Sequence, residues 1–177
     1  TGDQVTRYVY GTDVGDATPL VFRKDLLRAV IYPDSDDTTA LGNGLDGIYD
    51  RVEYKYNRQG ERIELKDQNG TVHQYTYDPQ GRPLADKVTT VGSGIDNAVL
   101  RIDREYEVRG LLSRVVSYSD TGGTTPVNDV RREYNSLAML SKAAVRVAGS
   151  GSDRVNCTRA VAIRPRTPAL GLSSVTS

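Results

Sequence analysis

The single histidine, His73, is the residue whose side chain could serve as a general base. A base of that kind acts on a nucleophile and is held in place by a third group. The sequence has no Gly-x-Ser-x-Gly segment and no Walker loop, and one histidine cannot form a His-Glu-x-x-His metal pair. We therefore predict no catalytic residue and no enzyme activity, and we favour a packed or hydrogen-bonded role for His73.

Three neighbouring carboxylates, Asp34, Asp36 and Asp37, are the candidates for holding a metal ion. Hard cations prefer clustered carboxylates, so calcium binding is one interpretation. The glycine and closing glutamate of an EF-hand are missing at the required offsets, which favours a solvated acidic loop. Cys157 is the only cysteine, and it excludes an internal disulfide and a cysteine-based zinc cluster. We expect neither a metal nor a cofactor.

Tyrosines supply nearly all of the aromatic chemistry, with eleven of them against one phenylalanine and no tryptophan. Three pairs are spaced two residues apart, in the segments Tyr8–Tyr10, Tyr54–Tyr56 and Tyr75–Tyr77. In a strand this spacing places both rings on one face. Exposed rings there would stack on sugars, whereas packed rings would form the core of a repeat. The second and third pairs run directly into turn sequences, which favours the repeat core.

The bulk composition favours thin β layers. Only 37% of the 177 residues are hydrophobic, and tyrosine buries a large ring while its hydroxyl reaches a partner or water. The net charge is zero, which gives no indication of nucleic-acid binding. No apolar run approaches the roughly 20 residues that cross a membrane. We expect neither a nucleic-acid partner nor a membrane span.

Turn signals separate short alternating segments. Asp78-Pro79-Gln80-Gly81 has the residues of a type I turn, and Asn57 and Gly60 occupy the same offsets after the preceding tyrosine pair. Residues 62–66 alternate polar and apolar, as a half-buried return strand does. Asn69-Gly70 then signals another hairpin.

The strand–turn–strand unit recurs along the chain. Tyr56 and Tyr77 are 21 residues apart, and fainter copies follow at Tyr106 and Tyr134, where Ala138 replaces the turn glycine. An N-terminal copy is expected from Tyr8 to Tyr32, with residues 25–32 as its return strand. Four or five units with this spacing predict a repeat architecture.

Two segments allow a helical alternative, and the end of the chain has a different character. Residues 26–31 and 137–145 are short apolar stretches that fit a helix or a strand. Beyond residue 142 no tyrosine appears, and the composition turns to Arg, Ser, Gly and Pro. We predict a repeat region over 1–142 and a mostly irregular, poorly ordered tail over 143–177.

The segment Tyr75–Leu84 is similar to the YD-repeat motif, in which Tyr-x-Tyr-Asp is followed by x-x-Gly-Arg-Leu, with Pro83 as an extra residue. Residues 54–62 resemble a second copy. The resemblance is to Rhs-type proteins, teneurins and the C components of toxin complexes. It implies an all-β fold of antiparallel hairpin repeats in a twisted sheet or ribbon, an open fragment of a shell. The repeat-core residues would be Tyr54, Tyr56, Gly60, Tyr75, Tyr77, Asp78, Gly81, Arg82, Tyr106, Gly110 and Tyr134.

The resemblance also implies a role. We expect a non-catalytic segment of a larger cell-surface or secreted protein that contributes β-sheet wall. The expected partners are other repeats of the same longer chain, with carbohydrate or an enclosed toxin domain as further candidates. A carbohydrate- or protein-binding module with an exposed tyrosine face is the alternative. Arg62 and Arg82, just after the turns, are expected to pair with acidic residues of adjacent strands.

Overall fold

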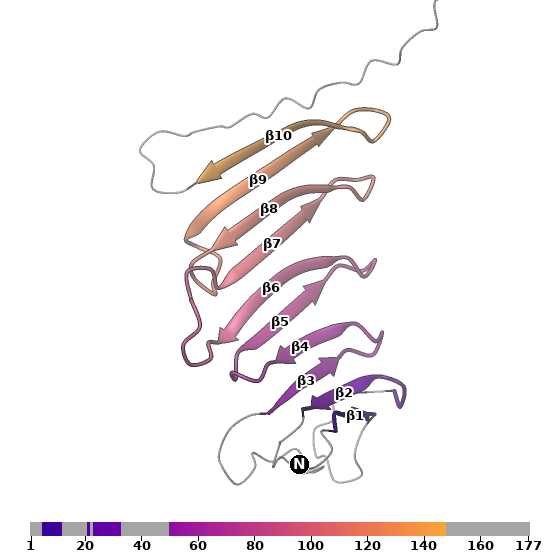
Figure 1. Ribbon diagram of the computed structural model, residues 1–177. Helices are drawn as coiled ribbons and strands as arrows, with labels where there is room; N and C mark the ends of the chain where they lie inside the picture. The colour runs from indigo at the N-terminus through magenta and orange to yellow at the C-terminus, as the bar shows by residue number, and fades with distance from the viewer. Residues whose placement is uncertain (1–4, 12–20, 22, 33–49, 148–177) are drawn as a thin grey trace, which may run out of the picture.

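The fold is one antiparallel sheet whose strands follow one another in chain order (Figure 1). The computed structural model describes residues 5–11, 21, 23–32 and 50–147. These residues contain ten strands and no helix. The strands are β1 Arg7–Tyr10, β2 Leu27–Ile31, β3 Arg51–Tyr56, β4 Arg62–Lys66, β5 Val72–Tyr77, β6 Pro83–Thr90, β7 Arg101–Tyr106, β8 Leu112–Tyr118, β9 Pro126–Tyr134 and β10 Leu140–Val147. The predicted all-β class is confirmed for this part of the chain.

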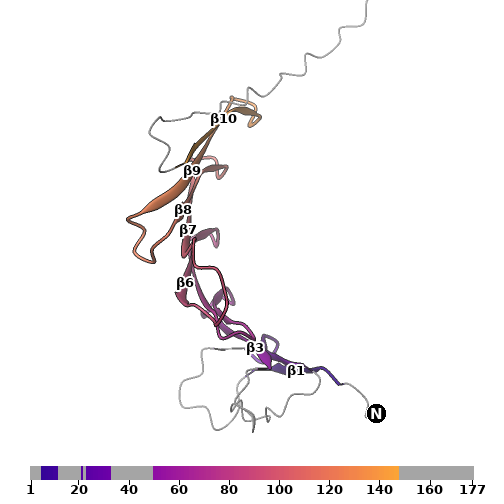
Figure 2. The ribbon, with the colours of Figure 1, turned by 60° about the vertical axis from the view of Figure 1, so that its left-hand side comes forward.

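The sheet is a single curved and twisted layer, seen nearly edge-on in Figure 2. Most strand residues are half-buried, and few side chains are buried. The buried apolar residues are Val21, Ala29, Val30, Ile31 and Val116. The described residues form no second layer, so most of their side chains are buried against same-face neighbours on adjacent strands. This explains the lean hydrophobic composition and the heavy use of tyrosine, which packs a ring without needing a dry environment.

Five hairpins share one internal geometry. In each, an outgoing strand (β1, β3, β5, β7 or β9) ends in a tyrosine, which we call the turn tyrosine. This tyrosine lies opposite the first residue of the return strand, and the next return-strand residue is skipped as a bulge. The pairs are Tyr10–Leu27, Tyr56–Arg62, Tyr77–Pro83, Tyr106–Leu112 and Tyr134–Leu140. The fainter copies inferred from the sequence are therefore full copies in backbone geometry.

Consecutive hairpins also join in one register. At each junction, two positions always face each other. One is the residue three positions before the turn tyrosine. The other is the third residue of the preceding return strand. The four such pairs are Glu53–Ala29, Gln74–Glu64, Asp103–Ala85 and Arg131–Arg114. Three of these junctions contain three residue pairs, and the β8–β9 junction contains five. The register is constant although the spacing of the tyrosines along the chain is not.

The two long edges of the ribbon differ. Along one edge, which we call the turn edge, lie the turns 57–61, 78–82, 107–111 and 135–139, on the right in Figure 1. Along the opposite edge, the loop edge, lie the connections between hairpins, among them residues 67–71, 91–100 and 119–125. These four turn-edge turns have one length, whereas loop-edge connections vary; the connection between β1 and β2, residues 11–26, is longer.

Both segments that allowed a helix are strands. Residues 27–31 form β2, and residues 140–147 form β10 after the turn at 135–139. Strand β10 runs across the boundary expected after residue 142. The Asp34–Asp37 cluster, Cys157 and the tail from residue 148 onward lie outside the described residues.

Candidate functional site

The turn that follows Tyr77 is built around one carboxylate. The Gly81 amide donates to the Asp78 carbonyl at 3.0 Å, and the Asp78 amide donates to the Arg82 carbonyl at 3.0 Å. Asp78 Oδ1 accepts from the amides of Gln80 and Arg82, each at 2.9 Å. Gly81 has φ +79°, the left-handed region that glycine enters without steric cost. The motif is a three-residue loop with a type I turn followed by a left-handed glycine.

Other turns repeat this carboxylate or amide cap. In each, one side-chain oxygen accepts from the backbone amides two and four residues later, an arrangement available to Asp and Asn but not to longer side chains. The capping residues are Asn57, Asp67, Asp78 and Asn135. The Asn69-Gly70 signal therefore marks a three-residue loop capped by Asp67, and not a two-residue hairpin turn. Ala138 occupies the left-handed position with φ 60°.

Arg82 joins the turn to the next hairpin. Its Nε donates to Asp78 Oδ2 at 2.6 Å, and its guanidinium lies 4.6 Å from the centre of the Tyr106 ring on β7. Burial raises the pKa of Asp78, but hydrogen bonds from the Arg82 and Gln80 amides and from the Arg82 guanidinium outweigh it, and the net pKa is lowered. The acidic partner of Arg82 thus belongs to its own turn and not, as the sequence suggests, to an adjacent strand.

Arg62 also differs from the expectation of an acidic partner. Its guanidinium lies 4.8 Å from the ring centre of Tyr75 and 6.0 Å from that of Tyr54. These contacts are of the cation–π type. Arg62 therefore brings together one ring from each of the two hairpins that resemble YD repeats most closely.

The turn tyrosines connect each hairpin to the one before it. Each hydroxyl donates to the backbone carbonyl of the first residue in the preceding return strand. We call this contact the hydroxyl bridge. The four bridges run from Tyr56 to Leu27 at 2.8 Å, from Tyr77 to Arg62 at 2.8 Å, from Tyr106 to Pro83 at 2.9 Å and from Tyr134 to Leu112 at 2.9 Å.

The bridges lie where the backbone pairing between hairpins stops, on the turn-edge side of each junction. Between β6 and β7 the paired residues begin at Ala85 and Asp103, so Pro83 lies beyond the ladder on the turn-edge side. Its carbonyl takes the Tyr106 hydroxyl in place of a backbone amide. Burial raises the pKa of Tyr56 and Tyr77 further above neutral pH.

His73 lies on β5 and is held on two sides. Its Nδ1 is 2.8 Å from Asp86 Oδ1 on β6, and its ring stacks on Tyr75 with centroids 6.2 Å apart and an interplanar angle of 15°. The structure thus places His73 in the hydrogen-bonded, ring-packed setting favoured from the sequence. Among the described residues, no group of three His, Cys, Asp or Glu side chains is arranged to hold a metal ion.

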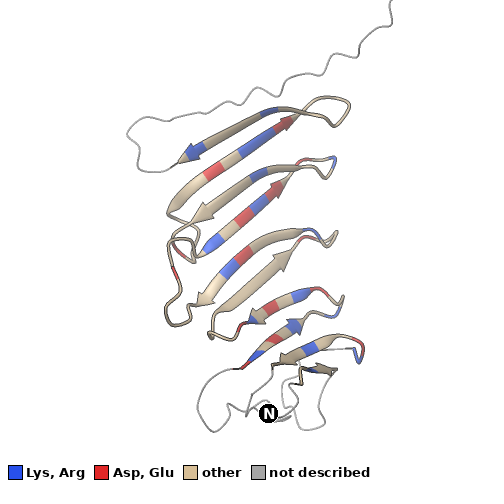
Figure 3. Cartoon of the chain, viewed as in Figure 1, with Lys and Arg blue, Asp and Glu red and all other residues tan. Residues whose placement is uncertain are grey.

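Charged residues of both signs alternate across the strands (Figure 3). The strongest cluster was missed in the sequence, because its members come from three different strands. Arg114 on β8 donates to both oxygens of Asp129 on β9, at 2.9 and 3.0 Å, and to Glu105 at 2.7 Å. Asp129, only 9% exposed, also accepts from Arg131 at 3.0 Å. The Arg114 hydrogen bonds lower the pKa of Asp129, with a smaller contribution from Arg131.

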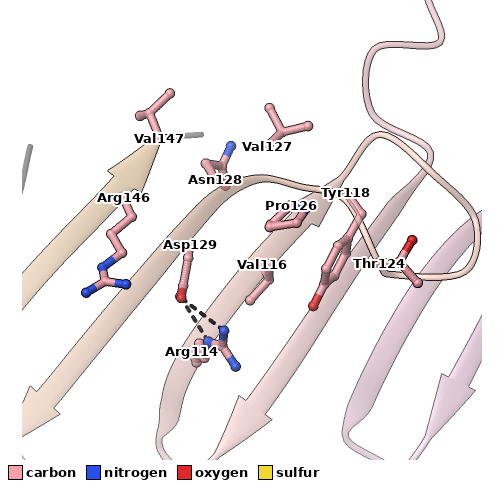
Figure 4. A pocket seen from close by; sticks show the side chains of 10 residues that line it. All are labelled: Arg114, Val116, Tyr118, Thr124, Pro126, Val127, Asn128, Asp129, Arg146 and Val147. Atoms are coloured by element: carbon pink, nitrogen blue, oxygen red, sulfur yellow. Dashed lines mark hydrogen bonds and ion pairs between the residues drawn. The ribbon is translucent and has the colours of Figure 1, made fainter. Parts of the chain in front are cut away.

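A shallow pocket of about 360 Å³ lies next to this cluster, over β8, β9 and β10 (Figure 4). Val116, Tyr118 and Pro126 supply its apolar lining, and Arg146 lies on its β10 side. The pocket holds no pairing of a nucleophile with a base. No signal in the sequence pointed to it, because its lining comes from separate strands.

Comparisons with known proteins give a distant structural likeness. No family model matches the chain, and no curated protein is significantly similar to it. A solved TcdB2-TccC3-Cdc42 structure is similar over 70% of this chain and 7% of that chain, with 15% identity and a TM-score of 0.31. A TcdB2-TccC3 structure without its hypervariable C-terminal region is similar over 55% and 5%, with 16% identity and a TM-score of 0.25.

The class of protein follows from the hairpins themselves. The chain spans less than a tenth of the length of these two solved chains. The described residues form an all-β repeat segment in which one hairpin geometry recurs five times. The chain has the antiparallel hairpin architecture expected of a YD-repeat fragment, and the resemblance stated from the sequence is confirmed at that level.

Proposed function

We propose that this chain is a non-catalytic structural segment of a larger Rhs or YD-repeat protein, in which it contributes β-sheet wall. The hydroxyl bridge is the observation that carries the proposal. In four consecutive junctions the hydroxyl of the turn tyrosine donates a hydrogen bond to the preceding hairpin. A hydroxyl used in this way stabilises the junction between two hairpins, which supports a structural role.

The rings themselves support the same role. Tyr54, Tyr56, Tyr75 and Tyr77 are all half-buried, and none forms an open stripe. Arginine guanidinium groups lie against Tyr54 and Tyr75. We infer that the residues predicted as the repeat core, from Tyr54 to Tyr134, act in structure and not in binding. Other repeats of a longer chain are then the first partners, and an enclosed toxin domain would be the cargo of the complete wall.

The alternative is a carbohydrate- or protein-binding module, and it draws support from one place. Tyr8 and Tyr10 on β1 are 61% and 57% exposed, unlike the tyrosines of the later hairpins. Exposed paired rings of this kind would stack on a sugar. A cell-surface or secreted setting would suit either role.

Two measurements separate the roles. Tyr77→Phe removes one hydroxyl bridge and is expected to lower the free energy of unfolding by about 0.5–1.5 kcal/mol. Wild-type chain on a glycan array is expected to bind no glycan. A glycan that binds the wild type, and is lost in a folded Tyr75→Ala variant but retained in Tyr8→Ala, would overturn the wall role. Loss in Tyr8→Ala alone would place the sugar at the N-terminal edge and support the alternative.

A further inference from the structure

The pocket over β8, β9 and β10 lies where the repeat departs from its own pattern. The β8–β9 junction contains five residue pairs, whereas each of the other three junctions contains three. The two additional pairs, Ser117–Asn128 and Tyr118–Pro126, extend the sheet toward the loop edge. Asn128, Tyr118 and Pro126 line the pocket (Figure 4). The hydroxyl bridges at the other junctions form without this extension, so the pocket is not a by-product of the repeat geometry.

The wall of the pocket on the side of the β8–β9 loop is fixed by hydrogen bonds. Asp120 Oδ1 accepts from the Thr124 amide at 3.1 Å, and Thr124 lines the pocket. Arg101 on β7 donates to the Gly122 carbonyl at 3.1 Å, and its guanidinium lies 6.0 Å from the centre of the Tyr118 ring. A site whose walls are already in place loses less conformational freedom when a ligand binds.

Arg146 places a cation on the β10 side of the pocket. Asp129 lies directly opposite Arg146 in the strand register. The Asp129 carboxylate nevertheless accepts from two other arginines, from Arg114 at 2.9 and 3.0 Å and from Arg131 at 3.0 Å. Its negative charge is thus matched by Arg114 and Arg131, while Arg146 is exposed and borders the pocket. A guanidinium in this position can bind an incoming carboxylate through two parallel hydrogen bonds.

The lining beside this cation is apolar. Val116 is only 3% exposed, and Tyr118 and Pro126 lie near it in the pocket (Figure 4). The pocket is shallow, with a volume of about 360 Å³. Small-molecule sites commonly bury about 70–90% of the ligand surface, whereas a free small molecule here would stay largely in water. A polypeptide can insert one or two side chains into such a pocket and leave its backbone outside.

We propose that this pocket is a docking site for a polypeptide segment that carries an aspartate or glutamate beside an apolar residue. Arg146 binds the carboxylate, and Val116, Tyr118 and Pro126 contact the apolar side chain. The inference goes beyond the wall role and does not depend on it. It gives this part of the sheet a partner chemistry that the repeating hairpins do not require.

Two matched peptides test the charge and the place of binding together. The probe is Ala-Leu-Glu-Leu-Ala, acetylated and amidated at its ends, and the neutral match is Ala-Leu-Gln-Leu-Ala. Each is titrated into the isotope-labelled full chain, and binding is followed through backbone amide chemical shifts. We expect the Glu peptide to shift amides of β8, β9 and β10 around the pocket. The Gln peptide should bind about 5- to 10-fold more weakly, because it lacks the charge that Arg146 holds.

Substitution of Arg146 tests whether this residue carries the preference. Arg146→Gln should bind the Glu peptide about 5- to 10-fold more weakly than the wild type does, and should no longer distinguish it from the Gln peptide. Arg146→Lys keeps the charge and should keep most of the preference. Arg132→Gln removes one positive charge from the opposite face of β9 and should bind like the wild type. Urea midpoints of the three variants check that the fold is intact.

Three results would overturn the proposal. One is a Glu peptide that leaves the amides around the pocket unshifted. Another is an Arg146→Gln variant that still prefers the Glu peptide. The third is isocaproate, a free acid with the branched apolar group of leucine, binding as tightly as the Glu peptide, since the ligand would then be a small organic acid and not a polypeptide. The wall role is tested separately, by the Tyr77→Phe and glycan measurements.

Discussion

The turn edge and the loop edge join the same strands by different means. On the turn edge, the turns 57–61, 78–82, 107–111 and 135–139 have one length, and the tyrosine before each bonds to the previous hairpin. Three of these turns carry a side-chain cap, from Asn57, Asp78 and Asn135. On the loop edge, the connections 67–71, 91–100 and 119–125 differ in length. From β3 onward the turn edge therefore keeps one geometry. Longer strands and longer loop-edge connections account for the uneven spacing of Tyr56, Tyr77, Tyr106 and Tyr134.

The connection at residues 67–71 shows which feature distinguishes the edges. It lies on the loop edge, yet Asp67 caps it as Asp78 caps a turn on the opposite edge. The residue before Asp67 is Lys66, and no hydroxyl bridge leaves this turn for another hairpin. A capped three-residue loop is thus found on both edges. Among the described capped loops, only those on the turn edge are preceded by a tyrosine that forms a hydroxyl bridge.

The largest expected effect comes from an insertion that breaks this constancy. Inserting Gly-Ser-Gly-Ser between Pro79 and Gln80 separates Asp78 from the amides that it caps and removes the two backbone hydrogen bonds of the turn. We expect the free energy of unfolding, measured in urea, to fall by about 2–4 kcal/mol.

The matched insertion goes into the loop edge, between Ser93 and Gly94, where the neighbouring residues are exposed. Lengthening a flexible loop adds closure entropy only slowly, so a loss below about 1 kcal/mol is expected. Equal losses at the two sites would mean that the edges do not differ in the way described.

A hydroxyl deletion tests the bridge without changing the turn. Tyr106→Phe keeps the ring under Arg82 but leaves the Pro83 carbonyl without its donor. The expected loss is about 0.5–1.5 kcal/mol of unfolding free energy. Tyr118→Phe, near the loop edge, is the control, because the Tyr118 hydroxyl makes no hydrogen bond with the described residues. If Tyr118→Phe costs as much as Tyr106→Phe, the bridge is not the source of the stability.

A smaller gain is expected at the last turn. Ala138 adopts φ 60°, and the left-handed region costs a residue with a Cβ about 1–2 kcal/mol. Ala138→Gly removes that cost. Glycine also loses more conformational entropy on folding than alanine does, which offsets about half of the stabilisation. We expect a net stabilisation of about 0.5–1 kcal/mol by urea unfolding. Ala144→Gly within β10 should instead destabilise, and a loss at both positions would contradict the strain at Ala138.

Local features of the fold could be predicted from the sequence, because turns and alternation are properties of adjacent residues. The Asp78 and Asn57 turns, the strands after them and the left-handed position at Ala138 all follow from short patterns. The pairing of Arg62 with rings could not be predicted, since it depends on how far the strands are offset.

The hydroxyl bridge was missed for the same kind of reason. It requires both the bulge after each turn and a ladder that stops short of the turn edge, and neither leaves a signal in the sequence. The network around Asp129 joins residues from β7, β8 and β9, so only the folded sheet brings them together. Contacts of this kind depend on the register of strands that are distant in the sequence.

The smallest effect concerns the acid sensitivity of the loop-edge connection that Asp120 holds. On the loop edge, hydrogen bonds from the Thr124 and Thr125 amides lower the pKa of Asp120 to about 2, despite an opposing effect of burial. A carboxyl whose pKa is lowered on folding stabilises the fold above its unfolded pKa of about 3.8, and this contribution disappears as the pH falls toward 2. Two of the three turn-edge caps, Asn57 and Asn135, carry no such dependence because amides do not titrate, whereas Asp78 also has a lowered pKa. We therefore expect the difference in urea midpoint between wild type and Asp120→Asn to shrink between about pH 4 and pH 2. A difference that stays constant over that range would show that the Asp120 charge does not hold this loop, and the contrast between the edges would then rest on the tyrosines alone.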